Sequence, residues 1–272
     1  MVAQKLSRAF FALGLIGLGA LSLIYADFAL QWQPVPQSVP SRELLAYASG
    51  AILVAAAAGL LWGRTAVVAA GVLFVYTLLW LVLLKLPSIA RAPLIEANWM
   101  GSAEIVVIVA AGWVLVALPS HTTPGRWTRV AQLAFGLSLI PLGISHFVYS
   151  KATIGFVPAW LPFRAGWAYL GGAGHIAAGL GVLFGVLPRL AARLEAAMIG
   201  VFTLLVWAPA AITAPTRLQW TGFVMSWTIA AAAWVVAESI GRITDSGVAK
   251  IPPDAARALD GSGSRDPVSA RP

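Results

Sequence analysis

The chain has 272 residues, of which 60% are hydrophobic and only 10% are charged, and its formal net charge is +8. Soluble domains carry about 25% charged residues, so this composition excludes an ordinary soluble domain and is typical of a protein whose solvent is the lipid bilayer. Cysteine is absent, which excludes disulfides, thiol catalysis, and iron–sulfur and zinc–thiolate sites.

The first apolar run, at about 9–25, has the layout of a signal peptide, with a basic start and an apolar middle. We predict instead that it is retained as the first membrane span, because a later, internal segment matches it. Asp27-Phe28 aligns with His146-Phe147 after a three-residue slip. The connection that follows, 31–41, contains three prolines and cannot be the interior of a helix.

Seven further apolar runs follow, each of roughly 17–22 residues, the length needed to cross a hydrocarbon core of about 30 Å. They lie at about 44–62, 66–86, 99–118, 130–148, 166–187, 194–213 and 219–238. Open sheet edges cannot face lipid, and the alternation typical of a β-barrel is absent from the sequence. The fold class predicted is therefore all-α, a polytopic transmembrane helix bundle with about eight spans.

Two halves of the chain repeat each other at a fixed spacing. The pattern V-P-x-x-[VL]-P-x-R occurs at 35–42 and again at 157–164, 122 positions later (157 − 35). The last helices of the halves match at a spacing of 121. This register indicates a tandem duplication of a four-helix unit. The domains predicted are a first repeat at 1–120, a second at 121–243 and a disordered cytoplasmic tail at 244–272.

The basic residues predict the orientation of the spans. If the N-terminus lies inside, twelve Lys and Arg residues fall on inner segments and six on outer segments, which places both termini in the cytoplasm. Four helices per repeat is an even number, so the two repeats should be parallel, related by a pseudo-two-fold axis along the membrane normal. The bases are spread over many loops, which indicates contact with the lipid bilayer and no nucleic-acid partner.

Four ionisable side chains inside or at the ends of spans form a candidate intramembrane polar site: Asp27, Glu104, His146 and His175. At 1.5 Å per residue, Glu104 lies about 8 Å deep and His175 about 14 Å deep, near the midplane. Ionisable groups at such depth are costly and are functional candidates by default. The alternative, a neutral histidine that only holds helices together, stays open for His175 and is favoured for His146.

Haem and metal ions are weak candidates for this site. His146 and His175 could be axial ligands of a b-type haem, but the predicted register puts them at depths about 10 Å apart. A metal held by His146, His175 and Glu104 has no spacing signature to support it. The sequence therefore predicts no metal site and assigns no catalytic residue.

The two V-P-x-x-[VL]-P-x-R segments are predicted to be ordered caps on the outer end of the bundle, covering the approach to His175. Prolines such as Pro158 and Pro162 fix φ and remove a donor, so each cap should be extended and stiff. Trp160 should give the second cap an apolar side chain to bury. Arg42 and Arg164, just beyond the final prolines, could pair with the candidate acids or with an anionic headgroup or ligand.

The stretch from Gly143 to Gly185 contains G-I-S-H-F-V-Y, then V-P-A-W-L-P-F-R, then the glycine-rich run A-Y-L-G-G-A-G-H. It resembles the DoxX-like family of small bacterial membrane proteins, which share the His-Phe, the V-P-x-x-L-P approach and a glycine-rich second helix. The first repeat fits in outline, with Asp27 in place of the histidine. His175 stands where the family commonly has glutamate. The resemblance implies a four-helix unit, here doubled, in the bacterial plasma (inner) membrane.

The function that the resemblance implies is an accessory or quinone-linked component of a redox or stress-response complex. With no cysteine and no nucleotide motif, the chain would need a bound quinone or a partner redox subunit, and His175 could donate a hydrogen bond to a quinone carbonyl. A small-solute transporter and a membrane scaffold without catalytic activity are the alternatives. The residues do not decide whether the chain is an enzyme.

Overall fold

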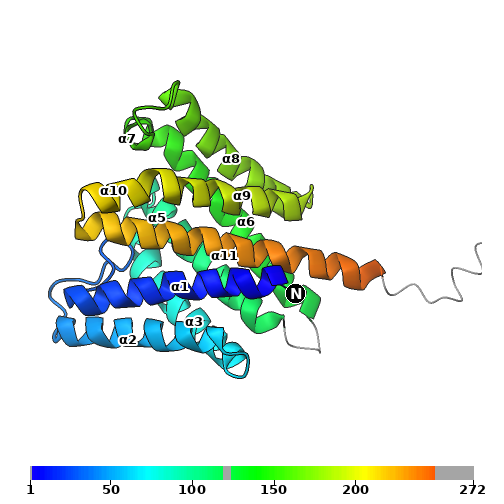
Figure 1. Cartoon of the computed structure of the whole chain (residues 1–272), viewed down its shortest axis with the longest axis horizontal. Coiled ribbons are helices and arrows are strands. Elements are labelled where there is room, and N and C mark those ends of the chain that lie inside the picture. Colours follow the sequence, from blue (N-terminus) through cyan, green and yellow to red (C-terminus); the bar gives the residue numbers. More distant parts are fainter. Residues whose placement is uncertain (1, 119–123, 249–272) are drawn as a thin grey trace, which may run out of the picture.

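The described part of the chain is helical and contains no strand (Figure 1). The computed structural model describes residues 2–118 and 124–248, with side chains for 2–118 and 125–240. Within these residues, eight helical segments are long and apolar enough to cross a membrane. The prediction of an all-α chain with about eight membrane-length helices is confirmed.

Six of the eight spans are single helices: α1 (Val2–Tyr25), α2 (Arg42–Leu61), α5 (Glu96–Ala117), α6 (Pro124–Val148), α8 (Arg164–Phe184) and α11 (Arg217–Val248). The other two are each built from three consecutive pieces. One consists of α3 (Ala66–Trp80), the π-helical turn η1 (Leu81–Lys85) and α4 (Leu86–Arg91). The other consists of α9 (Pro188–Phe202), η2 (Thr203–Trp207) and α10 (Ala208–Thr213). A short helix, α7 (Ser150–Phe156), follows α6.

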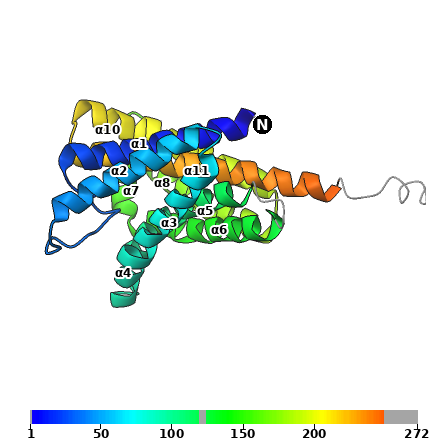
Figure 2. The same cartoon turned by 90° about the horizontal axis from the view of Figure 1, so that it is seen from below.

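The two π-helical turns have a common cause in the sequence. Pro87 and Pro209 each lie in the first turn of the short helix that follows. A proline inside a helix removes a hydrogen bond and clashes with the carbonyl four residues earlier, and a widened π turn accommodates that clash. The two prolines are 122 positions apart (209 − 87), the spacing of the repeated sequence pattern. Figure 2 shows α4 leaning out from the bundle beyond its π turn.

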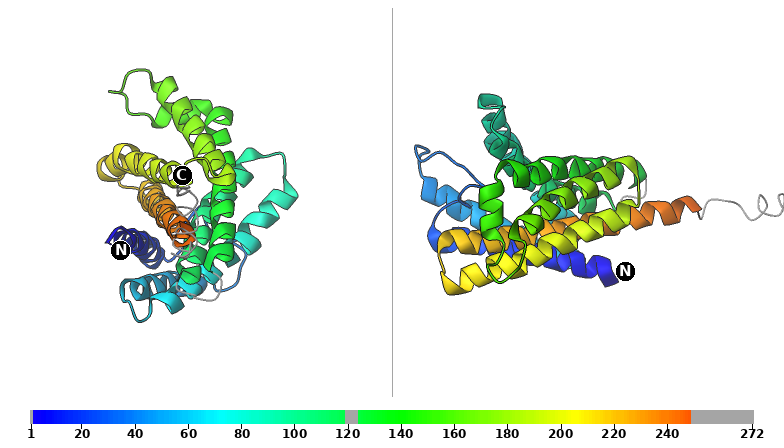
Figure 3. Two further views of the ribbon diagram at one scale, coloured as in Figure 1. Left: turned by 90° about the vertical axis from the view of Figure 1, so that its right-hand side faces the viewer. Right: turned by 90° about the horizontal axis from the view of Figure 1, so that it is seen from above.

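The helices pack in a closed ring. In order around the ring, α1 packs on α2, then come α3, α5, α6, α8, α9 and α11, and α11 packs back on α1. The helices α5 and α11 also pack on each other across the ring, and they are the two most buried of the described spans. The left view of Figure 3 looks along the bundle and shows α11 enclosed by its neighbours. The centre of the protein is therefore the contact between the last helices of the two halves.

The start of α1 and the described end of α11 lie at the same end of the bundle (Figures 1 and 2). The loop between α1 and α2 lies at the opposite end, together with α7 and α10. The helix α11 continues to Val248, so the first five residues of the predicted disordered tail, 244–248, are helical instead. The rest of that predicted tail lies outside the described residues.

The two proline-rich segments are turned and not extended, which corrects the predicted caps. In each, an amide donates to the carbonyl three residues earlier: Val39 to Pro36 at 3.3 Å and Leu161 to Pro158 at 3.0 Å. Both turns end in a left-handed residue that caps the next helix, Ser41 at φ 52° and Phe163 at φ 56°. The equivalence of the two segments thus extends to their backbone conformation.

The side chain of Trp160 is 71% exposed and does not bury against the bundle, contrary to expectation. Pro162 is also exposed, and Pro158 is half-buried. The second segment is anchored by polar groups instead. Arg164 donates from Nε to the carbonyl of Val157 at 2.8 Å, and the Trp167 indole donates to the carbonyl of Pro162 at 2.9 Å. An exposed tryptophan at the end of a span is typical of the membrane interface.

Glycines at the helix crossings give a first prediction. A Cβ at Gly143 would lie 2.5 Å from the carbonyl oxygen of Gly172, so α6 and α8 would have to separate. We expect Gly143→Ala to lower the free energy of unfolding by about 1–3 kcal/mol, the usual cost of overpacking. Thermal unfolding in detergent would measure it. The matched control is Gly71→Ala, which meets nothing within 4 Å and should be neutral or stabilising. Equal effects of the two substitutions would contradict the packing described.

Candidate functional site

Three ionisable side chains of the second half come together between α6, α8 and α9: His146, His175 and Glu195. Nδ1 of His175 lies 2.6 Å from Oε1 of Glu195, and the rings of His146 and His175 have centroids 5.2 Å apart. His175 is 6% exposed and Glu195 is 1% exposed, while His146 is half-buried. We call these three residues the His–Glu cluster.

The glycine-rich face of α8 makes room for this cluster. A Cβ at Gly172 would lie 2.7 Å from Cβ of His146, and one at Gly171 would lie 3.2 Å from Cε1 of the same ring. Small residues let membrane helices approach closely, and here the approach brings the imidazole of α6 onto the surface of α8. Gly171 and Gly172 are therefore what lets His146 reach His175.

The predicted difference of about 10 Å in depth overestimated the separation of the two histidine rings, whose centroids are 5.2 Å apart. Helix α6 runs toward the outer end of the predicted topology and α8 runs away from it. Cα–Cβ bonds tilt toward the N-terminus of their own helix, so His146 leans inward and His175 leans outward. The two side chains therefore point toward each other, and the axial rise of 1.5 Å per residue, on which the predicted depths were based, does not include this direction.

The hydrogen bonds of the cluster fix its protons in part. The carbonyl of Ala168, at 3.0 Å, can only accept, so Nδ1 of His146 donates to it and Nε2 is the remaining polar atom of that ring. Glu195 holds His175 in the same way, through Nδ1. Its second oxygen, Oε2, is buried and has no hydrogen-bond partner among the described residues. A carboxylate that holds an imidazole in this way fixes the tautomer and the orientation of the ring.

Glu195 was missed in the sequence. The span was predicted to begin at residue 194, which placed Glu195 at the membrane edge, but α9 begins at Pro188 and carries Glu195 two turns into the helix. The positions of the charged residues around this helix could have indicated that Glu195 is buried. Arg189 and Arg193 are four apart and share one face of α9, whereas Glu195 points about 200° away from Arg193 at 100° per residue. An acid on the face opposite the basic residues should face another helix.

Glu104 belongs to a separate cluster in the first half. Its Oε2 accepts a hydrogen bond from the indole of Trp32 at 2.8 Å. Lys85 is one of the six basic residues that the predicted topology assigns to outer segments. It is only 7% exposed and donates to the carbonyl of Gln31 at 2.8 Å. It lies over Gly101, where a Cβ would approach Nζ to 3.0 Å. Glu104 therefore does not join the two histidines as predicted.

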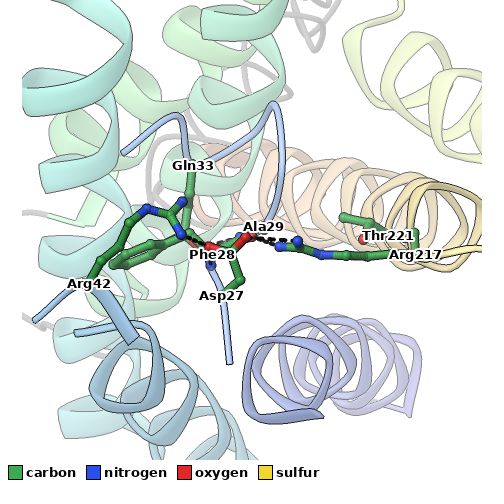
Figure 4. A network of polar contacts seen from close by, with 7 residues as sticks. All are labelled: Asp27, Phe28, Ala29, Gln33, Arg42, Arg217 and Thr221. Atoms are coloured by element: carbon green, nitrogen blue, oxygen red, sulfur yellow. Dashed lines mark hydrogen bonds and ion pairs between the residues drawn. The ribbon is translucent and has the colours of Figure 1, made fainter. Parts of the chain in front are cut away.

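Asp27 lies in the loop after α1 and binds two arginines from different parts of the chain (Figure 4). Arg42, at the start of α2, pairs with Oδ1, and Arg217, at the start of α11, pairs with Oδ2 at 2.8 Å. The amide of Phe28 donates to Oδ1 at 2.8 Å, and the Arg42 guanidinium lies 5.3 Å from the Phe28 ring centroid. Arg42 was predicted to pair with one of the candidate acids or with an anionic headgroup or ligand, and in the structure its partner is Asp27. We call Asp27, Arg42 and Arg217 the outer clasp.

Asp27 and His146 are not at equivalent places, although their sequences align. Each first helix crosses the second at a glycine pair, Gly19 with Gly50 and Gly143 with Gly172. His146 lies three residues beyond its crossing glycine, and the residue three beyond Gly19 is Ser22. Asp27 follows five residues later, in the loop. The sequence alignment at the His-Phe pair was therefore shifted with respect to the helix crossing.

The described residues contain no group of three or more His, Asp or Glu side chains arranged to hold a metal ion. A family model, for a domain of unknown function (DUF8561), matches residues 133–237. That stretch runs from within α6 to within α11 and contains the whole His–Glu cluster. Neither a curated protein nor a solved structure matches the chain.

The outer clasp should make stability depend on pH. Burial raises the pKa of Asp27, but the hydrogen bonds from Arg217, Arg42 and the Phe28 amide outweigh it, so the pKa lies below the ordinary 3.8. A carboxyl whose pKa is lowered by folding stabilises the protein at pH values above the ordinary pKa, and that contribution is lost as the pH falls through the folded pKa.

We therefore expect Asp27→Asn to lower the free energy of unfolding by about 1–2 kcal/mol at pH 7, the scale of partly exposed charge-assisted hydrogen bonds. The difference from the native protein should shrink as the pH falls below the ordinary pKa of an aspartate. Unfolding temperatures measured from pH 7 downward would test this, with Glu43→Gln as the exposed control. A difference that does not change with pH would show that the carboxylate charge is not responsible.

Proposed function

We propose that the chain is a tandem of two parallel four-helix units in a bacterial plasma membrane, with both termini in the cytoplasm. The equivalences at a spacing of 122 support the duplication: the two π turns, their prolines and the left-handed residues before α2 and α8. The packing supports it too, because the first helix of each half packs on the last helix of the other. The orientation is supported by Arg129, Arg189 and Arg193 at the end of the bundle that carries the start of α1.

We propose further that the His–Glu cluster binds a quinone or quinol, and that the protein is an accessory component of a membrane redox or stress-response complex. The single observation that carries this is the buried contact between His175 and Glu195 beside His146. Because Nδ1–H of His175 donates to the carboxylate, Nε2 of the neutral ring accepts a hydrogen bond, and then the proton, from a quinol hydroxyl. Once the ring is protonated, Nε2–H can donate to a quinone carbonyl.

The resemblance to the DoxX-like family adds support to this proposal. The family commonly has a glutamate at the position of His175, and in this chain a glutamate from the next helix contacts that histidine. The acid is thus retained in space and holds an imidazole. Because the chain has no cysteine and no nucleotide motif, electrons would come from or go to a partner redox subunit.

Binding of quinone analogues to the purified protein tests the site. We expect decylubiquinone or a short-chain menaquinone to raise the unfolding temperature of the native protein in detergent. His175→Gln and Glu195→Gln should weaken binding by about tenfold, equivalent to about 1.4 kcal/mol. Glu104→Gln is the matched control, a comparable substitution of an acid in the other half, and should keep native affinity.

A double variant guards against simple misfolding. Replacing one partner of a buried pair leaves the other uncompensated, whereas His175→Leu with Glu195→Met removes both polar groups and keeps apolar volume. This variant should fold and should not bind the quinone analogues. If it binds them as well as the native protein does, or if no quinone co-purifies with the native protein and none shifts its unfolding, the quinone proposal fails.

Growth of a deletion strain under thiol-oxidant stress would separate the proposal from its alternatives. A redox role predicts that the double variant fails to rescue the strain, while Glu104→Gln rescues it. A membrane scaffold predicts rescue by both. A solute transporter predicts uptake of a candidate solute by proteoliposomes of the native protein, with no dependence on quinone.

A further inference from the structure

A lateral groove of about 510 Å³ runs between α1, α9 and α11 and contains no residue of the His–Glu cluster. One wall is aromatic. The rings of Phe10 and Trp227 stack with centroids 5.2 Å apart and an interplanar angle of 5°, and Trp234 meets Phe10 edge-on at 5.7 Å. The indole of Trp227 donates to the carbonyl of Phe10 at 2.9 Å, which fixes this wall in place.

The opposite wall is made of small residues of α9, and this is why the groove is hollow. Ala196, Ala197 and Gly200 line it, and a Cβ at Gly200 would meet nothing within 4 Å. The hydroxyl of Thr203, also on this wall, is occupied by bonds to the carbonyl of Ile199 and the hydroxyl of Ser226. The interior of the groove therefore offers an apolar ligand a surface that is mostly carbon.

Charge gathers at one end of the groove only. Arg193 and Glu238 line that end, with the guanidinium 2.8 Å from the carboxylate, and Arg189 reaches the same carboxylate at 3.4 Å. Two guanidinium groups share one carboxylate, which leaves one excess positive charge (2 − 1). The side chains of Arg189 and Arg193 are 44% and 46% exposed, so both can also meet a ligand from outside.

The length of the groove matches one membrane leaflet. From Arg193 to Leu204, the last residue of α9 and η2 that lines it, is eleven residues, or about 16 Å along the helix at 1.5 Å per residue. One leaflet is half of a hydrocarbon core of about 30 Å. A partner helix that crossed the membrane would need twice this length.

We propose that this groove is a binding site for an anionic phospholipid, with one acyl chain between α1 and α9 and the phosphate at Arg189 and Arg193. The charged end lies toward the start of α1, so the lipid would come from the leaflet that faces that end. The proposal does not depend on quinone binding, because the two sites lie on different faces of α9.

Retention of lipid by the purified protein tests the proposal. The delipidated protein in detergent would be titrated with dioleoyl phosphatidylglycerol or dioleoyl phosphatidylcholine, and bound lipid would be counted by native mass spectrometry. We expect one phosphatidylglycerol per chain, bound about tenfold more tightly than phosphatidylcholine, the effect of one charge-assisted hydrogen bond of usual strength.

Two kinds of variant assign the binding to this groove. Gly200→Leu fills it without displacing the backbone and should abolish binding of both lipids, while Gly71→Leu, an equally open helical glycine on α3, should not. Arg189→Gln with Arg193→Gln should remove the preference for phosphatidylglycerol, and Arg126→Gln should keep it. Glu238→Gln should strengthen the preference, because it leaves both guanidinium groups free for phosphate.

Several outcomes would overturn the proposal. Equal affinity for the two lipids in the native protein, or equal effects of Gly200→Leu and Gly71→Leu, would show that the groove is not a headgroup-selective site. A native dimer that Gly200→Leu converts to monomers would show that a second copy of the chain occupies it.

Discussion

The close approach of helices at glycine pairs is the contact on which the rest of this structure depends. Apolar side chains do not drive membrane helices together, because lipid tails are equally apolar, so packing and hydrogen bonds must do so. At the crossings of α1 with α2 and of α6 with α8, a glycine of one helix faces the carbonyl of a glycine on the other. The polar groups of the second half meet because the backbones of α6 and α8 are so close.

Each half of the described chain contains one π turn, η1 or η2, but the side chains around the two turns differ. Lys85 ends η1 and lies over Gly101, while Trp207 ends η2 and lies over Gly222, where a Cβ would approach its ring to 2.2 Å. A buried cation in one half is thus replaced by an aromatic ring in the other. The polar chemistry of the second half lies on α6, α8 and α9 instead, so any activity of the His–Glu cluster is not duplicated.

The fold was largely predictable from the sequence because hydropathy and length decide it. Each apolar run is long enough to cross a bilayer, and a helix satisfies all of its backbone polar groups within one such segment. The candidate site was predictable only in part. His146 and His175 stand out as costly groups in apolar runs, but their contact depends on side-chain direction, which axial depth does not include. Glu195 was hidden because a helix boundary was placed six residues too late. The partners of Asp27 lie 15 and 190 positions away, and no local pattern indicates the second of these.

The ring of helices is closed by packing and not by the chain. The link from α5 to α6 joins two helices that also pack on each other, and α11 packs on α1 in the same way without any link. The α5–α6 contact is therefore between helices joined by a loop, whereas the α1–α11 contact is between helices far apart in the sequence. The order of the helices along the chain follows the order of synthesis and does not by itself determine which helices pack together. During synthesis, α1 would stay without one of its two neighbours until α11 is made.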